Sequence, residues 1–256
     1  MSETLLPLKE ALWAASITKE KLAELPAAHF DRSVVLVDSE EGARRAAEIL
    51  RQETELGFDT ETRPSFRRGQ SFNVALLQLS THSVCFLIRL NKIGLTPEIK
   101  SILEDENIRK IGVSIHDDFH NLHKIYSLEP KGFIDLQGFV KNYNIADNSL
   151  SRIYAILFGQ RISKGQRLTN WEASHLTLHQ QEYAALDALA CIKIYDHLTT
   201  VGFSAVDSPY YRDINATPAP APKEEPKKAQ EASDTDATAE QATENKSTPS
   251  KRKNET

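Results

Sequence analysis

The residues with the clearest chemical potential are two carboxylates, Asp59 and Glu61, which a single residue separates. Residues 56–58 (Leu-Gly-Phe) precede them and are typical of a buried strand. On a strand, residues two apart point to the same face, so Asp59 and Glu61 lie side by side. Two adjacent carboxylates repel each other, and a hard divalent cation bound through oxygen relieves that repulsion. The pattern is also common on solvated strands, so further residues must decide.

A third carboxylate, Asp118, follows another strand-like segment, residues 109–113. The stretch from Ile111 to Leu122 is predicted to contain the end of a strand, a glycine-containing bend and the start of a helix from about Asp118. This places Asp118 near the end of the sheet. An acidic residue in a first helical turn is equally well explained as a cap or as a partner of the helix dipole.

The last candidates are Tyr183 and Asp187, on a helix predicted over residues 178–200. Thr177 and Gln180 have the spacing of a capping box, which supports the start of this helix. Residues four apart share a helix face, so Tyr183 and Asp187 are neighbours. The helix is rich in alanine and leucine, and an Asp buried in it is unfavourable unless it is paired or bound to a metal. A Tyr–Asp hydrogen bond or a solvent-facing stripe are the alternatives.

The surrounding pattern predicts the elements that must position these residues. Strands rich in apolar residues, joined by short turns, indicate an antiparallel meander, and strands alternate with helices after it. We therefore expect an α/β fold with a mixed sheet, an antiparallel meander plus parallel strands, flanked by helices. The expected strands are 33–37, 55–61, 74–80, 84–88, 109–113 and 133–136, and the expected helices are 40–52, 96–104, 118–126, 137–143, 149–158 and 178–200.

Two helix starts and one helix face can be predicted in more detail. Thr18 is a candidate N-cap for a helix in the N-terminal lead-in, and Pro26 ends or follows that helix. Asp38 or Ser39 is expected to cap the helix over 40–52. The apolar face of this second helix is expected to consist of Ala43, Ala46, Ala47, Ile49 and Leu50.

The chain divides by composition into a helical lead-in (1–31), one domain (32–205) and a tail (216–256). The tail consists mainly of Ala, Pro, Lys, Glu, Ser and Thr, which cannot bury enough surface to fold, so we expect it to be disordered. Lys251-Arg252-Lys253 is a small basic cluster within it. The formal net charge of -5 excludes a generally basic coat, although a local basic groove or bound metal ions remain compatible with it.

The two cysteines and the hydropathy pattern indicate the cellular compartment of the protein. Cys85 and Cys191 lie in separate apolar runs, which predicts reduced core thiols and no disulfide framework. No apolar run reaches membrane-spanning length, and the N-terminus lacks the pattern of a signal peptide. We therefore expect a cytoplasmic protein with no membrane partner.

Taken in order, the three acidic segments resemble the motifs of the DEDDy 3′-5′ exonucleases, whose relatives include ribonuclease D and the Werner syndrome protein exonuclease. The first motif is Phe58 to Thr62, the second runs through Asp118, and the third is Tyr183 to Ala188. Further likeness to the Werner-type branch lies between the last two, in Ser149-Leu150, Leu157-Phe158-Gly159, Thr169 to Glu172 and Leu176-Thr177. The resemblance covers roughly residues 30–205.

This resemblance implies a ribonuclease H-like fold and a mechanism. Two Mg²⁺ or Mn²⁺ ions, about 3.5–4 Å apart, would clamp the scissile phosphate. Asp59 would bridge both ions, Glu61 and Asp187 would complete one site, and Asp118 would support the other directly or through water. Tyr183 would orient the attacking water, and the 3′-terminal nucleotide would leave as a 5′-monophosphate.

Basic and aromatic residues near these motifs are candidates for contacts with nucleic acid. Arg67 and Arg68 follow the first motif, and Lys164 and Arg167 precede Trp171. They could line a groove for backbone phosphates, with the aromatic ring for stacking. Solvated loop charge is the alternative for the basic residues, and for Trp171 we favour core packing over stacking on a base.

The likeness to the Werner-type branch slightly favours DNA as the substrate, and three other interpretations stand beside a DNA exonuclease. His116 and His120 have the i,i+4 spacing of some zinc sites, but no glutamate stands in the required place between them, so we favour packing, exposure or phosphate contact. RNA trimming like that of ribonuclease D would use the same chemistry. A catalytically weak nucleic-acid-binding domain is the non-enzymatic alternative, and the presence of all five expected active-site residues argues against it.

Overall fold

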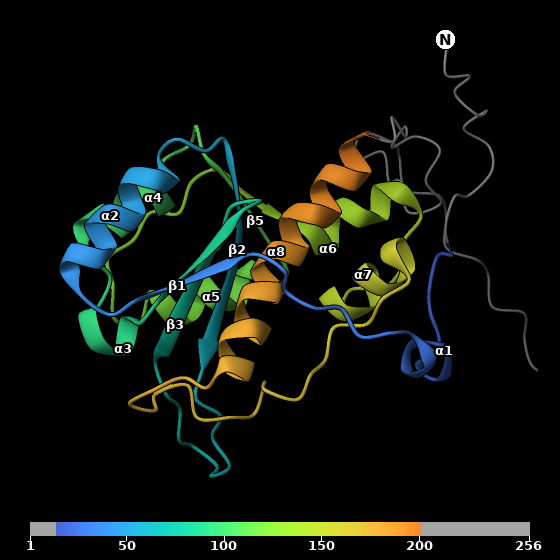
Figure 1. Ribbon diagram of the computed structural model, residues 1–256, viewed down its shortest axis with the longest axis horizontal. Coiled ribbons are helices and arrows are strands. Elements are labelled where there is room, and N and C mark those ends of the chain that lie inside the picture. The colour runs from blue at the N-terminus through green and yellow to red at the C-terminus, as the bar shows by residue number, and fades with distance from the viewer. Residues whose placement is uncertain (1–13, 201–256) are drawn as a thin grey trace, which may run out of the picture. The chain divides into compact units, whose positions relative to one another are not determined.

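The computed structural model describes residues 14–200, and within them a six-stranded mixed sheet forms the centre (Figure 1). The strand order is β1-β4-β3-β2-β5-β6. No helix in the described part of the chain has the length and apolar content needed to cross a membrane. The strands are β1 (Ser33–Val37), β2 (Glu55–Thr62), β3 (Val74–Ser80), β4 (Val84–Ile88), β5 (Arg109–Gly112) and β6 (Phe133–Asp135).

The pairing confirms the predicted combination of a meander and parallel strands. β2, β3 and β4 are antiparallel neighbours, whereas β1 is parallel to β4, β5 to β2 and β6 to β5. β2 is thus an inner strand, with Asp59 opposite Gln78 of β3. The register shifts between Glu61 and Thr62, the last two residues of β2.

The two faces of β2 are covered by different helices, because successive side chains on a strand point to opposite faces. Leu56 and Phe58 join an apolar cluster with helices α2 (Glu40–Leu50) and α4 (Pro97–Leu103), and α5 (Ile115–Leu122) packs on the same side. The alternate residues Gly57, Asp59 and Glu61 face the long helix α8 (Leu178–Thr200). Figure 1 shows α2 and α4 on one side of the sheet and α8 on the other.

The remaining helices mostly follow the prediction. Ser39 caps α2 by accepting the Gly42 N–H, but Ile49 is 44% exposed, so it was wrongly assigned to the buried face. α5 begins at Ile115 and not near Asp118, and the four-residue helix α3 was not predicted. The other elements are α1 (Lys19–Glu24), α3 (Leu90–Ile93), α6 (Leu136–Phe139), the 3-10 helix η1 (Val140–Tyr143) and α7 (Leu150–Phe158).

Helix α8 lies unusually close to β2. The capping box at its start is confirmed, since Gln180 Oε1 accepts the Thr177 N–H at 3.0 Å and Thr177 Oγ1 accepts the Gln180 N–H at 3.2 Å. A β-carbon added at Gly57 would stand 1.9 Å from the carbonyl oxygen of Ala188. The absence of a side chain at Gly57 therefore allows the helix backbone to contact the strand directly.

The described part of the N-terminal lead-in is bound to the domain. Thr18 caps α1 as predicted. On either side of that helix, the Ile17 N–H donates to Asp147 and the Ala28 N–H donates to the carbonyl of Arg161, both at 2.9 Å. Residues 1–13 and the predicted disordered tail, 216–256, lie outside the described residues.

Candidate active site

The end of β2 and the middle of α8 bring three carboxylates together. Oxygen atoms of Asp59, Glu61 and Asp187 all lie within 4.8 Å of one another. Glu61 is 7% exposed and Asp187 is 6% exposed. All three line a cleft of about 460 Å³, together with Tyr183. The structure thus joins two strand residues with a helix residue that is far away in the sequence.

The electrostatics of this group are unfavourable without a cation. Burial raises the pKa of Asp59 well above its usual range, and the charges of Asp187, Glu61 and Asp118 raise it further. Burial, followed by the charges of Asp187 and Asp118, raises the pKa of Glu61 to about 9. Buried carboxylates that repel one another hold protons at neutral pH unless a positive ion replaces those protons.

Asp118 reaches the site from the other face of β2. Its Oδ1 accepts a short hydrogen bond from the hydroxyl of Thr60, which points away from α8. Burial raises the pKa of Asp118 to about 7, and the Thr60 hydrogen bond opposes that rise. Asp118 is not among the residues that line the cleft, but its charge acts on both Asp59 and Glu61. Thr60 therefore links the second acidic motif to the first.

Asp135, at the end of β6, fixes the start of the helix that carries Asp118. Its carboxylate accepts the backbone N–H groups of Ser114 at 3.3 Å and Ile115 at 3.2 Å. Ser114 has a left-handed backbone with φ 60°, which is uncommon for a residue with a side chain. These contacts turn the chain sharply out of β5 and place Asp118 in the first turn of α5.

Tyr183 and Asp187 are partners on α8, as the spacing predicts. Burial raises the pKa of Asp187 to about 7, and a hydrogen bond from the Tyr183 hydroxyl opposes that rise. Burial and the neighbouring carboxylates raise the pKa of Tyr183, so this hydroxyl is neutral at physiological pH. The ring of Trp171 lies 6.1 Å from the ring of Tyr183. Trp171 has no exposed surface, so it packs in the core, as favoured from the sequence, and its inclusion among the candidate substrate-contacting residues is wrong.

Two of the four predicted basic residues lie at the cleft. Lys164 and Arg167 line it, and their charges act on Asp187 and Glu61 respectively. Arg67 and Arg68 are exposed in the loop after β2 and are not among the lining residues. Their proposed contact with nucleic acid stays a prediction.

Another part of the cleft lining was not predicted as part of the site. It is formed by the start of α7 and by neighbouring polar residues, which include Gln137, Asn148 and Ser149. Ser149 is the N-cap of α7, and its buried hydroxyl has no hydrogen-bond partner within the described residues. The family likeness at Ser149-Leu150 was a signal for this region, but it did not reveal that Ser149 lines the cleft together with the carboxylates.

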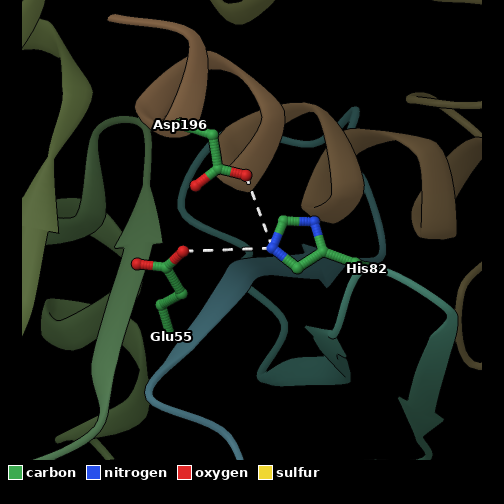
Figure 2. A group of neighbouring side chains, drawn as sticks. All are labelled: Glu55, His82 and Asp196. Carbon is green, nitrogen blue, oxygen red and sulfur yellow. Dashed lines mark ion pairs between the residues drawn. The ribbon is translucent and has the colours of Figure 1, made fainter. Parts of the chain in front are cut away.

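A second group of ionisable residues joins the other end of β2 to α8 (Figure 2). His82, in the turn between β3 and β4, lies 3.9 Å from Glu55 and 3.4 Å from Asp196. Arg109 forms an ion pair with Glu55 at 3.1 Å. Burial, followed by the neighbouring Glu55, raises the pKa of Asp196 to about 6. Because positive and negative side chains alternate in this cluster, we interpret it as a structural link between β2 and α8.

Comparison with known proteins gives a consistent picture. Residues 34–202 match a family model described as 3′-5′ exonuclease. The mouse bifunctional 3′-5′ exonuclease/ATP-dependent helicase WRN is 31% identical over 156 residues, which are 59% of this chain and 11% of that protein. Exonuclease 3′-5′ domain-containing protein 2 of Drosophila melanogaster is 34% identical over 149 residues, 56% of this chain and 25% of that protein. The matched part thus spans a quarter or less of these two relatives.

Solved structures share the fold. The Aedes aegypti Nibbler EXO domain aligns with a TM-score of 0.61 and 22% identity, over 70% of this chain and 96% of that chain. Escherichia coli RNase D aligns with a TM-score of 0.60 and 22% identity, over 66% and 45% of the two chains. At this identity the likeness concerns the fold alone, and it confirms the ribonuclease H-like arrangement predicted from the sequence.

Proposed function

The chain belongs to the 3′-5′ exonuclease family, and on that premise we propose that it removes nucleoside 5′-monophosphates from the 3′ end of nucleic acid with the aid of two divalent cations. The observation that carries this proposal is the meeting of Asp59, Glu61 and Asp187 in one cleft that Tyr183 also lines, with the charge of Asp118 acting on Asp59 and Glu61. A phosphodiester substrate is itself anionic, so four carboxylates would repel it if no cation were bound.

The donor set fits hard divalent cations. Asp59, Glu61 and Asp187 offer carboxylate oxygens within 4.8 Å of one another, and their raised pKa values support a site where protons or cations offset the negative charge. Carboxylates suit Mg²⁺ and Mn²⁺ better than softer metals. We infer that these residues would hold the cations, with Asp118 contributing directly or through water. When bound, the cations would neutralise the charge of the phosphate and favour ionisation of the attacking water.

The remaining residues have distinct tasks in this proposal. The neutral Tyr183 hydroxyl donates to Asp187 and uses its oxygen lone pairs to orient the attacking water in line with the phosphorus. Lys164 and Arg167 bring positive charge to the cleft wall and attract the phosphate backbone. Asn148 and Ser149 line the same cleft as the carboxylates and bind the terminal nucleotide.

We propose DNA as the slightly favoured substrate and RNA as the second candidate. The support for DNA is the resemblance to the Werner-type branch, with 31% identity to mouse WRN over 156 residues. The support for RNA is the fold shared with structures described as an exoribonuclease and as RNase D in complex with RNA U12. Discrimination depends on contacts with the 2′ position of the sugar.

The decisive assay offers 5′-labelled single-stranded DNA, duplex DNA with a recessed 3′ end, and RNA, each with Mg²⁺, Mn²⁺ or EDTA. We expect a ladder that shortens from the 3′ end only when a divalent cation is present. Cleavage that persists in EDTA, or that begins at internal positions, would refute the proposal. The ratio of rates on DNA and RNA of the same sequence decides between the two substrates.

The raised carboxyl pKa values predict how stability depends on pH. Unfolded Asp and Glu have pKa values of about 3.9 and 4.3, whereas Asp118 and Asp187 reach about 7 and Glu61 about 9 in the fold. The folded protein therefore binds more protons between these limits, so its stability falls as the pH rises from about 4 to 9. In EDTA we expect the melting temperature to fall over this window.

Divalent cations should reverse that loss, because they replace the protons. We expect Mg²⁺ to raise the melting temperature more at pH 9 than at pH 6, as measured by differential scanning fluorimetry with and without EDTA. A shift with Mg²⁺ that is the same at both pH values would contradict this assignment of the carboxylates.

A further inference from the structure

Gln78 lies on β3 directly opposite Asp59 of β2. Residues paired in this way on antiparallel strands point to the same face, with their β-carbons about 4.5–5.5 Å apart. Leu87, the partner of Gln78 on β4, packs in the apolar layer that includes Ala184 and Ala188 of α8. The Gln78 side chain therefore extends beneath α8, on the same face as the Asp59 carboxylate.

The Gln78 amide is buried without a partner. The residue has no exposed surface, and neither Nε2 nor Oε1 forms a hydrogen bond within the described residues. Buried amides are nearly always hydrogen-bonded, and an unpaired one destabilises the fold. An apolar side chain of similar size would fill the space without that penalty. Packing alone therefore does not explain a glutamine here.

Asp59 is the neighbour that can use this amide. Within residues 14–200, a hydrogen bond from the backbone N–H of Thr60 lowers the pKa of Asp59 and so favours the charged carboxylate. An ionised carboxylate accepts about four hydrogen bonds or ligands, so it has room for another donor besides a cation. A neutral amide N–H can orient a carboxylate without adding a charge that would repel the cation, as Lys or Arg would do.

We propose that Gln78 is a positioning residue for Asp59: when a divalent cation is bound, Gln78 Nε2 donates a hydrogen bond to the Asp59 carboxylate and holds it in the orientation that binds the cation. The proposal rests on the proposed function in that Asp59 is taken as a metal ligand. Loss of such a supporting hydrogen bond typically weakens metal affinity by about 10- to 100-fold. Gln78 contacts neither the cation nor the substrate in this role.

The test compares the full chain with its Gln78→Met variant, which preserves the length of the side chain and removes the amide. We expect Mn²⁺, titrated by calorimetry, to bind about 10- to 100-fold more weakly to the variant. In EDTA the variant should melt at the same or a higher temperature, because an unpaired buried amide has been removed. Leu87→Met, in the same layer on β4, is the matched control for repacking and should retain the Mn²⁺ affinity of the parent.

Nuclear magnetic resonance supplies a second readout. The side-chain NH₂ signals of Gln78 are identified by their absence from the spectrum of Gln78→Met, and they should shift when Mg²⁺ is added to the parent. Unchanged signals, or an unchanged Mn²⁺ affinity in the variant, would overturn the proposal. So would a variant whose melting temperature in EDTA falls together with its affinity, since that pattern indicates packing.

These outcomes separate this proposal from the proposed function. A parent chain that binds Mn²⁺ through the Gln78-dependent site but leaves DNA and RNA intact would contradict the nuclease and support the role of Gln78. A chain that degrades nucleic acid but whose Mn²⁺ affinity is unchanged by Gln78→Met would support the nuclease and contradict the role of Gln78. A parent chain that binds no Mn²⁺ would overturn both.

Discussion

The Asp59→Asn variant should lose about 10³-fold or more of its exonuclease rate while its metal-free fold becomes more stable. Asp59 lies among Glu61, Asp187 and Asp118, whose charges act on it directly. Removing its charge removes a cation ligand, so turnover falls. The same change relieves repulsion among buried carboxylates, so the melting temperature in EDTA should rise. Asp187→Asn should behave in the same way, because Asp187 belongs to the same group of ligands.

The opposite signs of these two effects distinguish a metal site from a structural cluster. The measurements are the initial rate on 3′-labelled oligonucleotides in Mg²⁺ and the melting temperature with and without Mg²⁺. Asp117→Asn is the matched control, because Asp117 is exposed and precedes Asp118 on the same helix. This control should retain the parental rate. Near-parental activity in Asp59→Asn or Asp187→Asn would disprove the assignment of ligands.

The Gly57→Ala variant should lose about 3 kcal/mol of unfolding free energy, since a rigid backbone cannot yield to the added methyl group. The new β-carbon would lie 1.9 Å from the Ala188 carbonyl oxygen, so β2 and α8 must separate. For a domain of this size the melting temperature should fall by roughly 6–12 °C. Asp187 precedes Ala188 and would move with it, so Mg²⁺ affinity should fall as well.

Gly138→Ala provides the comparison for this prediction. An added β-carbon at Gly138, in helix α6, has no neighbour within 4 Å. Replacing glycine by alanine in a helix stabilises it by up to about 1 kcal/mol, so this variant should melt at or above the parental temperature. If Gly57→Ala also unfolds at the parental temperature, direct contact between the strand and the helix is ruled out.

The strands and the long helix could be predicted because local pattern determines them. Apolar runs bounded by turn residues mark β3 and β4 at their observed limits, and the Thr177–Gln180 capping box marks the start of α8. α3 has only four residues and shows no helical periodicity, so no pattern in the sequence predicted it. The early start of α5 depends on Ser114 in a left-handed conformation that Asp135 stabilises, and this contact joins separate strands.

The active-site carboxylates could be predicted in type and order, but their supporting contacts could not. The Thr60–Asp118 hydrogen bond links two elements whose pairing no local spacing reveals. Gln78 stands in an apolar run, and only the register of β3 against β2 places it opposite Asp59. Trp171 follows two basic residues in the sequence, so stacking on a base stayed open beside core packing, and only three-dimensional packing shows that it has no exposed surface.

The long separation between Asp59 and Asp187 also has a consequence for the protein during its synthesis. β2 emerges from the ribosome early, whereas α8, which carries Asp187, is made near the end of the described residues. Closing so long a loop is unfavourable until the intervening strands and helices have folded. A nascent chain therefore has only part of the ligand set, and the catalytic centre that we propose could not hydrolyse nucleic acid until α8 had docked on the finished sheet.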